Sequence, residues 1–402
     1  MANQDTNTTN GESTEEPFPW HLGVFDAHCH PTDTVASLQD IPNMSAKALI
    51  IMATRAQDQD LVSQFANHVG YNPQTESAQC RVIPSFGWHP WFSYQIYDDT
   101  TTSGETTQSA SSNRDNHYRA VLTSPSINSA FLNSLPEPRP LSIYLSETET
   151  YLQRYPLALV GEIGIDRSFR LPNLNGEAFS HDPSLTPGGR EGRKLTPHKV
   201  SMDHQCKIFK AQLKLAGKMQ RAVSVHGVAA HGALFETLKS TWKGHEREVV
   251  SKRVRKRRMS VKGAHDHEAD QENGVSARSG PKPFPPRICL HSFSGPLESI
   301  KPYLNPSIPA DIFFSFSQVI NFSTPAAAKA EEVIKAVPKD RILVESDLHC
   351  AGERMDGLLE GMCREICRIK GWGLEKGVLQ LGWNWKHFAL GVLEEGEVVE
   401  GV

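Results

Sequence analysis

Side chains that can bind a metal recur along this 402-residue chain, in each case at the end of an apolar run. They lie in residues 25–30, 87–90, 161–166 and 345–347 and at His226 and His291. Imidazole nitrogens and carboxylate oxygens together suit divalent zinc, manganese, magnesium or iron. Clustered around an ion with open coordination positions, they convert water into a nucleophile at neutral pH. The sequence therefore predicts a metal-dependent hydrolase.

The pair His28 and His30 is the strongest of these signals. Residues i and i+2 of a strand point to the same face, so both rings can reach one ion. A single histidine such as His226 is weaker, because a chain with 17 histidines places several beside apolar segments by chance. For Glu162 the alternative is a structural ion pair, since a buried carboxylate is costly without a partner. Its position between glycines at a strand end favours a ligand.

The composition is that of an ordinary soluble protein, with 22% charged residues and a net charge of -4. Any nucleic-acid binding must therefore come from a local site. No apolar run approaches the roughly 20 residues that span a bilayer, so no membrane interaction is expected. The seven cysteines are irregularly spaced without a Cys-x-x-Cys pair, which argues against a disulfide framework. We expect a reducing compartment, cytoplasmic or nuclear.

Eight short apolar or β-branched runs are typical of strands buried on both faces, as in parallel sheets. They span residues 24–28, 48–54, 81–86, 158–163, 222–226, 287–291, 312–316 and 341–345. Amphipathic helices are predicted at 203–219, 326–337 and 354–370. Alternating strands and helices imply right-handed βα units, and eight strands imply a closed α/β barrel. In such barrels function collects at the carboxyl ends of the strands, where the candidate ligands lie.

We predict one domain over residues 18–395, preceded by a flexible polar tail at 1–17. Long insertions are expected at about 98–137, 172–197 and 245–286, which are rich in Ser, Thr and Asn or in Gly, Pro and charge. Such composition buries too little apolar surface to order itself. Protein partners would bind through these insertions. The basic run from Lys252 to Arg258 is either a nuclear localisation signal, a phosphate-contacting patch or a solvated charged segment.

Six motifs in fixed order resemble those of the TatD-like metal-dependent hydrolases, a family of amidohydrolase-type barrels. They are Phe-Asp-Ala-His-Cys-His at 25–30, Gly-Trp-His-Pro at 87–90, Gly-Glu-Ile-Gly-Ile-Asp at 161–166, a strand ending in His226, Leu-His-Ser-Phe-Ser-Gly at 290–295 and Ile-Leu-Val-Glu-Ser-Asp at 342–347. The match covers residues from about 24 to 390, outside the insertions. The resemblance implies a (β/α)8 TIM barrel with a two-metal centre and deoxyribonuclease activity.

The resemblance also implies a role for each matching residue. His28 and His30 would hold one of two divalent ions (Mg, Mn or Zn), and His226 and His291 would hold the other. Glu162 would bridge both ions, and Asp347 would bind metal and help to orient the attacking water. Two such ions can clamp the attacking and leaving oxygens of a phosphodiester, with Glu162 and Asp347 as the catalytic carboxylates.

Three further residues of the motifs are expected around this centre. His89 resembles a residue at the pocket rim and is predicted to bind substrate phosphate, with stabilisation of a turn as the alternative. Asp26 and Asp166 are expected to orient the ligands, because a metal-bound histidine usually donates its other nitrogen to a carboxylate or carbonyl.

The chain also departs from the family pattern at three positions. Gly227 and Val228 follow His226 where relatives commonly have His-x-Arg, which removes a bidentate phosphate donor. The residues after Asp347 are Leu-His-Cys instead of a small residue and proline, and Gln318 follows Ser317 where Ser-Gly is common. These departures bear on substrate preference.

The leading prediction is a metal-dependent hydrolase of TatD type that cleaves phosphodiester bonds in DNA at accessible ends, with metal-activated water as the nucleophile. One alternative keeps the metal centre but acts on an amide or ester, because a fold does not fix a substrate. The other is a non-catalytic protein-interaction scaffold on the same barrel.

Overall fold

The computed structural model describes residues 16–75, 77–100, 110–123, 126–173, 182, 184–186, 193–249, 282–323 and 327–391. Nearly all of the predicted tail at 1–17 lies outside these residues. So do much of 172–197 and 245–286, including the basic run from Lys252 to Arg258. None of the described helices has the length and apolarity needed to cross a membrane.

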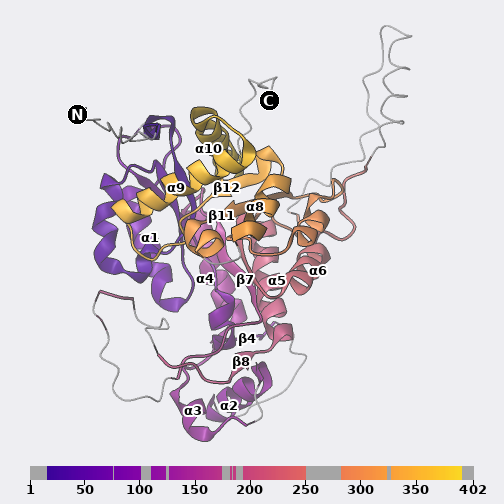
Figure 1. The fold of residues 1–402 in the computed structure, drawn as a ribbon. Helices are drawn as coiled ribbons and strands as arrows, with labels where there is room; N and C mark the ends of the chain where they lie inside the picture. The colour runs from indigo at the N-terminus through magenta and orange to yellow at the C-terminus, as the bar shows by residue number, and fades with distance from the viewer. Residues whose placement is uncertain are drawn as a thin grey trace, which may run out of the picture.

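The centre of the fold is a ring of parallel strands surrounded by helices (Figure 1). One sheet has the order β1-β2-β3 and a second the order β12-β11-β10-β9-β7. Their bounds are Phe25–Cys29 (β1), Ala48–Met52 (β2), Arg81–Ser85 (β3), Val160–Asp166 (β7), Val223–Val228 (β9), Arg287–Leu290 (β10), Asp311–Phe316 (β11) and Ile342–Val344 (β12). The predicted (β/α)8 TIM barrel is confirmed, and each of the eight predicted runs contributes a strand.

Two seams close the sheets into a barrel. At the first, the backbone N–H of Leu159 donates to the carbonyl of Pro84 over 3.1 Å, which joins β3 to β7. At the second, the N–H of Asp347 donates to the carbonyl of His28 over 3.0 Å, which joins β12 to β1. The second seam therefore lies between two candidate metal ligands.

Both faces of the strands are buried, which explains their nearly continuous apolar sequences. On β2, Leu49 and Ile51 belong to the same core as Val62 of the neighbouring helix α1, while Ile50 belongs to a second cluster that includes Trp385. Alternate residues of a strand point to opposite faces, so the two clusters lie on opposite sides of the sheet.

The barrel helices are α1 (Ala56–Val69), α4 (Leu141–Arg154), α5 (Met202–Lys218), α6 (His231–Trp242), α8 (Ala327–Ala336), α9 (Glu353–Lys370) and α10 (Leu374–Leu390). The predicted helices at 203–219, 326–337 and 354–370 correspond to α5, α8 and α9. Helix α10 contacts the amino end of β12, where Nδ2 of Asn384 donates to the carbonyls of Lys339 and Ile342 over 2.7 and 2.8 Å. Its Trp385 ring stacks on Phe25 at 4.4 Å. This helix therefore lies at the end of the barrel opposite the candidate ligands.

In its described residues, 98–100, 110–123 and 126–137, the insertion is not the unstructured loop that its composition predicts. It contains α2 (Ala110–Val121), β5 (Leu122–Thr123) and α3 (Ser129–Ser134), and β5 pairs antiparallel with β8 (Lys199–Val200). These elements, which we call the satellite unit, lie below the barrel in Figure 1. Its core contains Tyr94, Tyr118, Val121, Leu122, Phe131, Leu132, Leu135, Phe169, Leu171 and Val200. The prediction of disorder was wrong, because the few apolar residues of this insertion pack against apolar residues from distant segments of the chain.

Candidate metal centre

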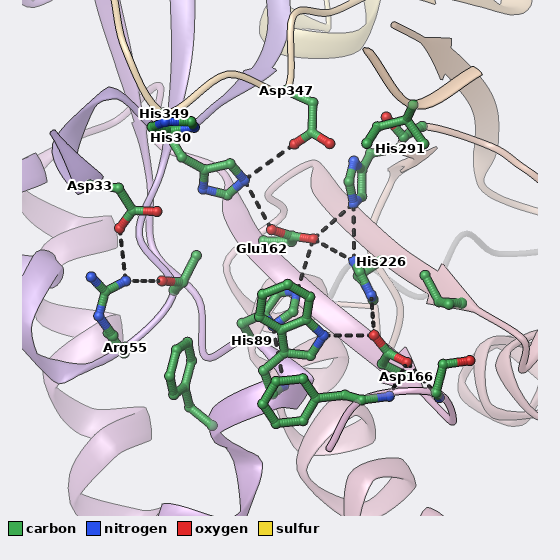
Figure 2. Close-up of a pocket in the computed structure, with 18 of the residues that line it drawn as sticks. His30, Asp33, Arg55, His89, Glu162, Asp166, His226, His291, Asp347 and His349 are labelled. Carbon is green, nitrogen blue, oxygen red and sulfur yellow. Dashed lines mark hydrogen bonds and ion pairs between the residues drawn. The ribbon is translucent and has the colours of Figure 1, made fainter. Parts of the chain in front are cut away.

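The six predicted ligands meet at the carboxyl ends of β1, β7, β9, β10 and β12. Five of them line a cavity of about 890 Å³ (Figure 2): His30, Glu162, His226, His291 and Asp347. His28 is fully buried, and its Nε2 lies 3.0 Å from Nε2 of His30. The structure therefore brings together all six side chains that the sequence singled out.

Glu162 stands between two groups of histidines. Its Oε2 lies 3.4 Å from Nε2 of His28 and 3.2 Å from Nε2 of His30. Its Oε1 lies 2.7 Å from Nδ1 of His226 and 2.8 Å from Nε2 of His291. The two oxygens of one carboxylate thus face two separate imidazole pairs, which is the arrangement expected of a bridging ligand.

Asp347 completes the group on the Oε2 side. Its Oδ1 lies 3.5 Å from Nε2 of His30 and 3.8 Å from Nε2 of His28. The residue has a backbone φ of 54°, a left-handed conformation that is unfavourable for aspartate. Strained residues of this kind persist where the surroundings fix them, often at functional sites. Here the hydrogen bond from its N–H to His28 fixes the backbone.

The donor atoms around Glu162 fit divalent cations better than they fit hydrogen bonds alone. Three imidazole nitrogens lie within 3.1 Å of its Oε1, because Nε2 of His89 is also 3.1 Å away. In addition, Nδ1 of His226 lies 3.3 Å from Nε2 of His291, and Nε2 of His28 lies 3.0 Å from Nε2 of His30. A carboxylate oxygen has two lone-pair sites, which is too few to accept hydrogen bonds from three imidazoles. A single cation, by contrast, binds the lone pairs of several ligands at once.

Both carboxylates of the centre are held in their charged form. Burial favours the neutral acid, but the electrostatic influence of the imidazoles of His89, His291 and His28 outweighs it and holds the pKa of Glu162 well below its usual value. The pKa of Asp347 is also lowered, since the hydrogen bond from His30 and the charge of His291 outweigh burial. Ionised carboxylates are the form that binds cations.

Neighbouring side chains orient two of the candidate ligands. Nδ1 of His28 lies 2.7 Å from the hydroxyl of Ser224, and Nε2 of His226 lies 3.2 Å from Oδ2 of Asp166. Asp166 therefore has the expected contact with a ligand. Ser224 was not predicted, and only its position two residues before His226 in the same strand signals that it faces the centre.

Glu345 is a further buried carboxylate beneath the centre. It accepts hydrogen bonds from the backbone N–H of Ser292 over 2.8 Å and from the hydroxyls of Ser292 and Ser315. Its Oε1 lies 3.5 Å from Nδ1 of His291. Glu345 thus fixes the segment that follows β10 and faces the outer nitrogen of a candidate ligand.

Asp26 has a different role from the one expected. Its Oδ1 accepts from the backbone N–H groups of His28 and Ser346 over 2.9 and 3.1 Å, and does not contact a ligand ring. Burial raises the pKa of Asp26 to about 7. Asp26 therefore ties the end of β1 to the end of β12 and positions the ligands through the backbone.

His89 is buried beside Glu162, and its contacts support the turn-stabilising alternative. It precedes the 3-10 helix η4 (Pro90–Gln95), and its Nδ1 accepts from the N–H of Trp91 over 3.1 Å. Burial lowers the pKa of His89 to about 4, so the ring is neutral and Nε2 carries the proton that faces Glu162. Its predicted contact with substrate stays a prediction.

Glycines allow the strands around Glu162 to approach closely. Gly164 of β7 pairs with His226 of β9, and a Cβ on Gly164 would lie 2.0 Å from the carbonyl oxygen of His226. A Cβ on Gly87 would lie 2.5 Å from the carbonyl carbon of Gly161. Any larger residue at either position would push Glu162 or His226 out of place.

The positions that depart from the family pattern also border the cavity. Gly227 and Val228 line it where an arginine was expected, and the exposed side chains of Arg170 and His349 line it as well. Arg55 is buried and pairs with Asp33 over 2.9 Å and with Asp58 over 3.2 Å. Of the residues named here, Arg170 and His349 are the ones exposed at the cavity.

Comparison with known proteins identifies the family of this chain. A family model described as TatD related DNase matches residues 25–378. Cut9-interacting protein scn1 of Schizosaccharomyces pombe is 38% identical over 366 residues, which is 91% of this chain and 98% of that protein. A Saccharomyces cerevisiae protein named as an uncharacterized deoxyribonuclease is 25% identical over 333 residues, covering 81% of this chain and 83% of that protein. The chain belongs to the TatD-related family of hydrolases.

Solved structures show the same fold. A TatD-family hydrolase of Entamoeba histolytica has a TM-score of 0.50 at 12% identity, covering 92% of this chain and 99% of that chain. An uncharacterized amidohydrolase of Saccharomyces cerevisiae has a TM-score of 0.50 at 13% identity, with 92% and 99% coverage. At these identities the likeness concerns the barrel alone.

Proposed function

We propose that this chain is a divalent-cation-dependent phosphodiesterase that cleaves DNA from accessible ends. The observation that carries the proposal is the position of Glu162, whose two oxygens face two separate histidine pairs within 3.4 Å. The family and the relative named as a deoxyribonuclease support DNA as the substrate. Two cations held side by side suit an in-line displacement at phosphorus.

The residues divide into two groups around Glu162. His28, His30 and Asp347 would hold one cation, and His226 and His291 the other, with Glu162 shared. Bound divalent cations supply Lewis-acid activation of water and offset the charge of the phosphate. Asp347 is ionised and faces the cavity, so it can accept the proton of the attacking water. Ser224 and Asp166 hold the rings of His28 and His226 in position.

The test is cleavage of end-labelled single-stranded and duplex DNA by purified protein with magnesium, manganese or zinc. The labelled DNA should shorten progressively from an end, and Glu162→Gln should reduce the rate of cleavage at least about a hundredfold. Glu149→Gln is the matched control, because Glu149 lies at the surface and pairs with Lys218 over 2.7 Å. Intact DNA with all three metals, while another TatD-family nuclease cuts it, would refute the proposal. Turnover of amide or ester substrates instead would favour the acyl-hydrolase alternative.

We also propose that the chain binds a protein partner, as the name of the fission-yeast relative indicates for that protein. The satellite unit is a surface added to the barrel, which makes it the candidate for this contact. A double variant, His28→Ala with His30→Ala, separates the two roles. It should lose DNA cleavage and keep binding to the Cut9 counterpart, measured by co-purification of the two purified proteins. Loss of both DNA cleavage and binding to the Cut9 counterpart in this double variant would argue against a separate partner surface.

A further inference from the structure

Part of the cavity lining is apolar and takes no part in the proposed cation chemistry, and we call it the apolar wall. It is formed by Trp91, Phe92, Phe169, Leu185, Leu195 and Val228. The cavity volume of about 890 Å³ lies near the upper end of the roughly 300–1,000 Å³ found for ligand pockets. The site therefore has room for a flat apolar group in addition to a phosphate.

The aromatic part of this wall is rigid and is fixed relative to the candidate ligands. The rings of Trp91 and Phe169 stack at 4.9 Å with an interplanar angle of 12°. Nε1 of Trp91 donates to Oδ2 of Asp166 over 2.6 Å, and the N–H of Phe169 donates to Oδ1 over 2.9 Å. The indole ring centre lies 6.2 Å from that of His226.

The satellite unit supports this wall from behind. Phe169 belongs to the satellite core and also lines the cavity. Its side chain is 8% exposed, so most of its surface is packed and its ring cannot swing away. An aromatic wall that is held this firmly loses little entropy when a flat ligand binds to it.

We propose that Trp91 and Phe169 form a stacking subsite for an unpaired nucleobase of the nucleotide that carries the scissile phosphate. The proposal rests on the proposed phosphodiesterase function and names the form of its substrate. Bases stack on rigid aromatic side chains without regard to sequence. A base enclosed in a cavity has left its partner strand, so the substrate is a single strand or a frayed end. The exposed Arg170 at the same cavity offers a cation to the phosphates.

The test compares binding of thymidine 5′-monophosphate with binding of deoxyribose 5-phosphate in the presence of magnesium. The wild-type protein should bind the nucleotide about fivefold to a hundredfold more tightly, the range that one stacked base provides. Phe169→Leu keeps an apolar side chain but removes the aromatic face, and should lose most of that preference. Phe131→Leu is the matched control, because Phe131 lies in the same satellite core but not among the cavity-lining residues of the described chain.

A second measurement does not depend on any variant folding. An oligonucleotide whose terminal nucleotide lacks its base should be cleaved more slowly by the wild-type protein than the intact one. Equal binding of nucleotide and sugar phosphate, equal cleavage of both oligonucleotides, or the same loss in Phe131→Leu as in Phe169→Leu would each overturn the subsite. Tighter binding of a benzoylated amino acid than of the nucleotide would overturn it in favour of an amide substrate. Nucleotide preference without cleavage of DNA would refute the phosphodiesterase function and leave the subsite standing.

Discussion

Nε1 of Trp91 lies 2.6 Å from Oδ2 of Asp166, and that same oxygen lies 3.2 Å from Nε2 of His226. The indole of Trp91 therefore orients the carboxylate of Asp166, which in turn orients His226, a candidate metal ligand. Partners of metal ligands typically change metal affinity by about 10-fold to 100-fold when they are removed. The contact links the wall of the cavity to the geometry of its centre.

We predict that Trp91→Phe weakens binding of one of the two proposed cations by about tenfold, because an aromatic ring remains but Asp166 loses the hydrogen bond from Nε1 of Trp91. Isothermal titration with manganese measures the two affinities. Trp88→Phe is the control, since its indole N–H also makes one hydrogen bond, to the carbonyl of Phe92 over 2.8 Å. Equal changes in the two variants would mean that the Trp91 contact serves general stability only.

We predict that Glu162→Ala loses both equivalents of metal, whereas Asp347→Ala loses one. Glu162 faces both histidine pairs, but Asp347 lies near His28 and His30 alone among the candidate histidines whose contacts are described. Elemental analysis of the dialysed proteins gives the stoichiometry. Retention of one full equivalent in Glu162→Ala would contradict the bridging role.

We predict that Ser224→Ala lowers metal affinity by about 10-fold to 100-fold, because His28 loses the hydroxyl that holds its outer nitrogen at 2.7 Å. Ser63→Ala is a suitable comparison, since Ser63 is also buried and its hydroxyl contacts Tyr155 over 2.9 Å in another part of the core. Equilibrium dialysis against zinc measures both variants. An unchanged affinity in Ser224→Ala would show that packing alone orients His28.

We predict that the protein loses stability between pH 6.5 and pH 4, in part through His204. Burial lowers the pKa of His204 to about 4, while its Nε2 lies 2.9 Å from the carbonyl of Ser93. The unfolded chain binds more protons than the folded chain in this window, so stability is full above pH 6.5 and falls as the pH falls. At pH 5 the free energy of unfolding should be lower by about 2 kcal/mol through His204 than it is above pH 6.5.

The variant His204→Gln removes the titrating group and can keep a hydrogen bond to the Ser93 carbonyl. Its unfolding free energy, measured with urea at pH 7 and pH 5, should depend less on pH than that of the wild-type protein. Parallel losses in the two proteins would assign the acid sensitivity to other groups.

Much of the barrel and its centre was predictable from sequence because the signals are local. A strand buried on both faces is a continuous apolar run, as in β2, and its carboxyl end is where barrels place chemistry. His28 and Glu162 could be found in this way. Helix α10 was not predicted. It contacts the end of the barrel through Asn384 and Trp385. The spacing of these residues in the sequence does not distinguish this helix from any other.

The satellite unit and the residues around the ligands could not be predicted, because their partners are distant in the chain. Tyr118 and Phe131 lie in a polar stretch and find their core with Phe169 and Leu171, which follow β7. Trp91 and Ser224 are ordinary residues in sequence, and only the structure shows that they contact Asp166 and His28. Composition averages over such residues and so predicts disorder where long-range pairing gives a fold.

The seam between β1 and β12 has a consequence for how the protein is made. His28 and His30 leave the ribosome with the first strand of the barrel, whereas Asp347 follows the last strand. A chain that stops before β12 would lack both Asp347 and the edge that receives β1, and with them part of the proposed first cation site. In the proposed assignment, the first cation site is therefore complete only after the last strand of the barrel has been made.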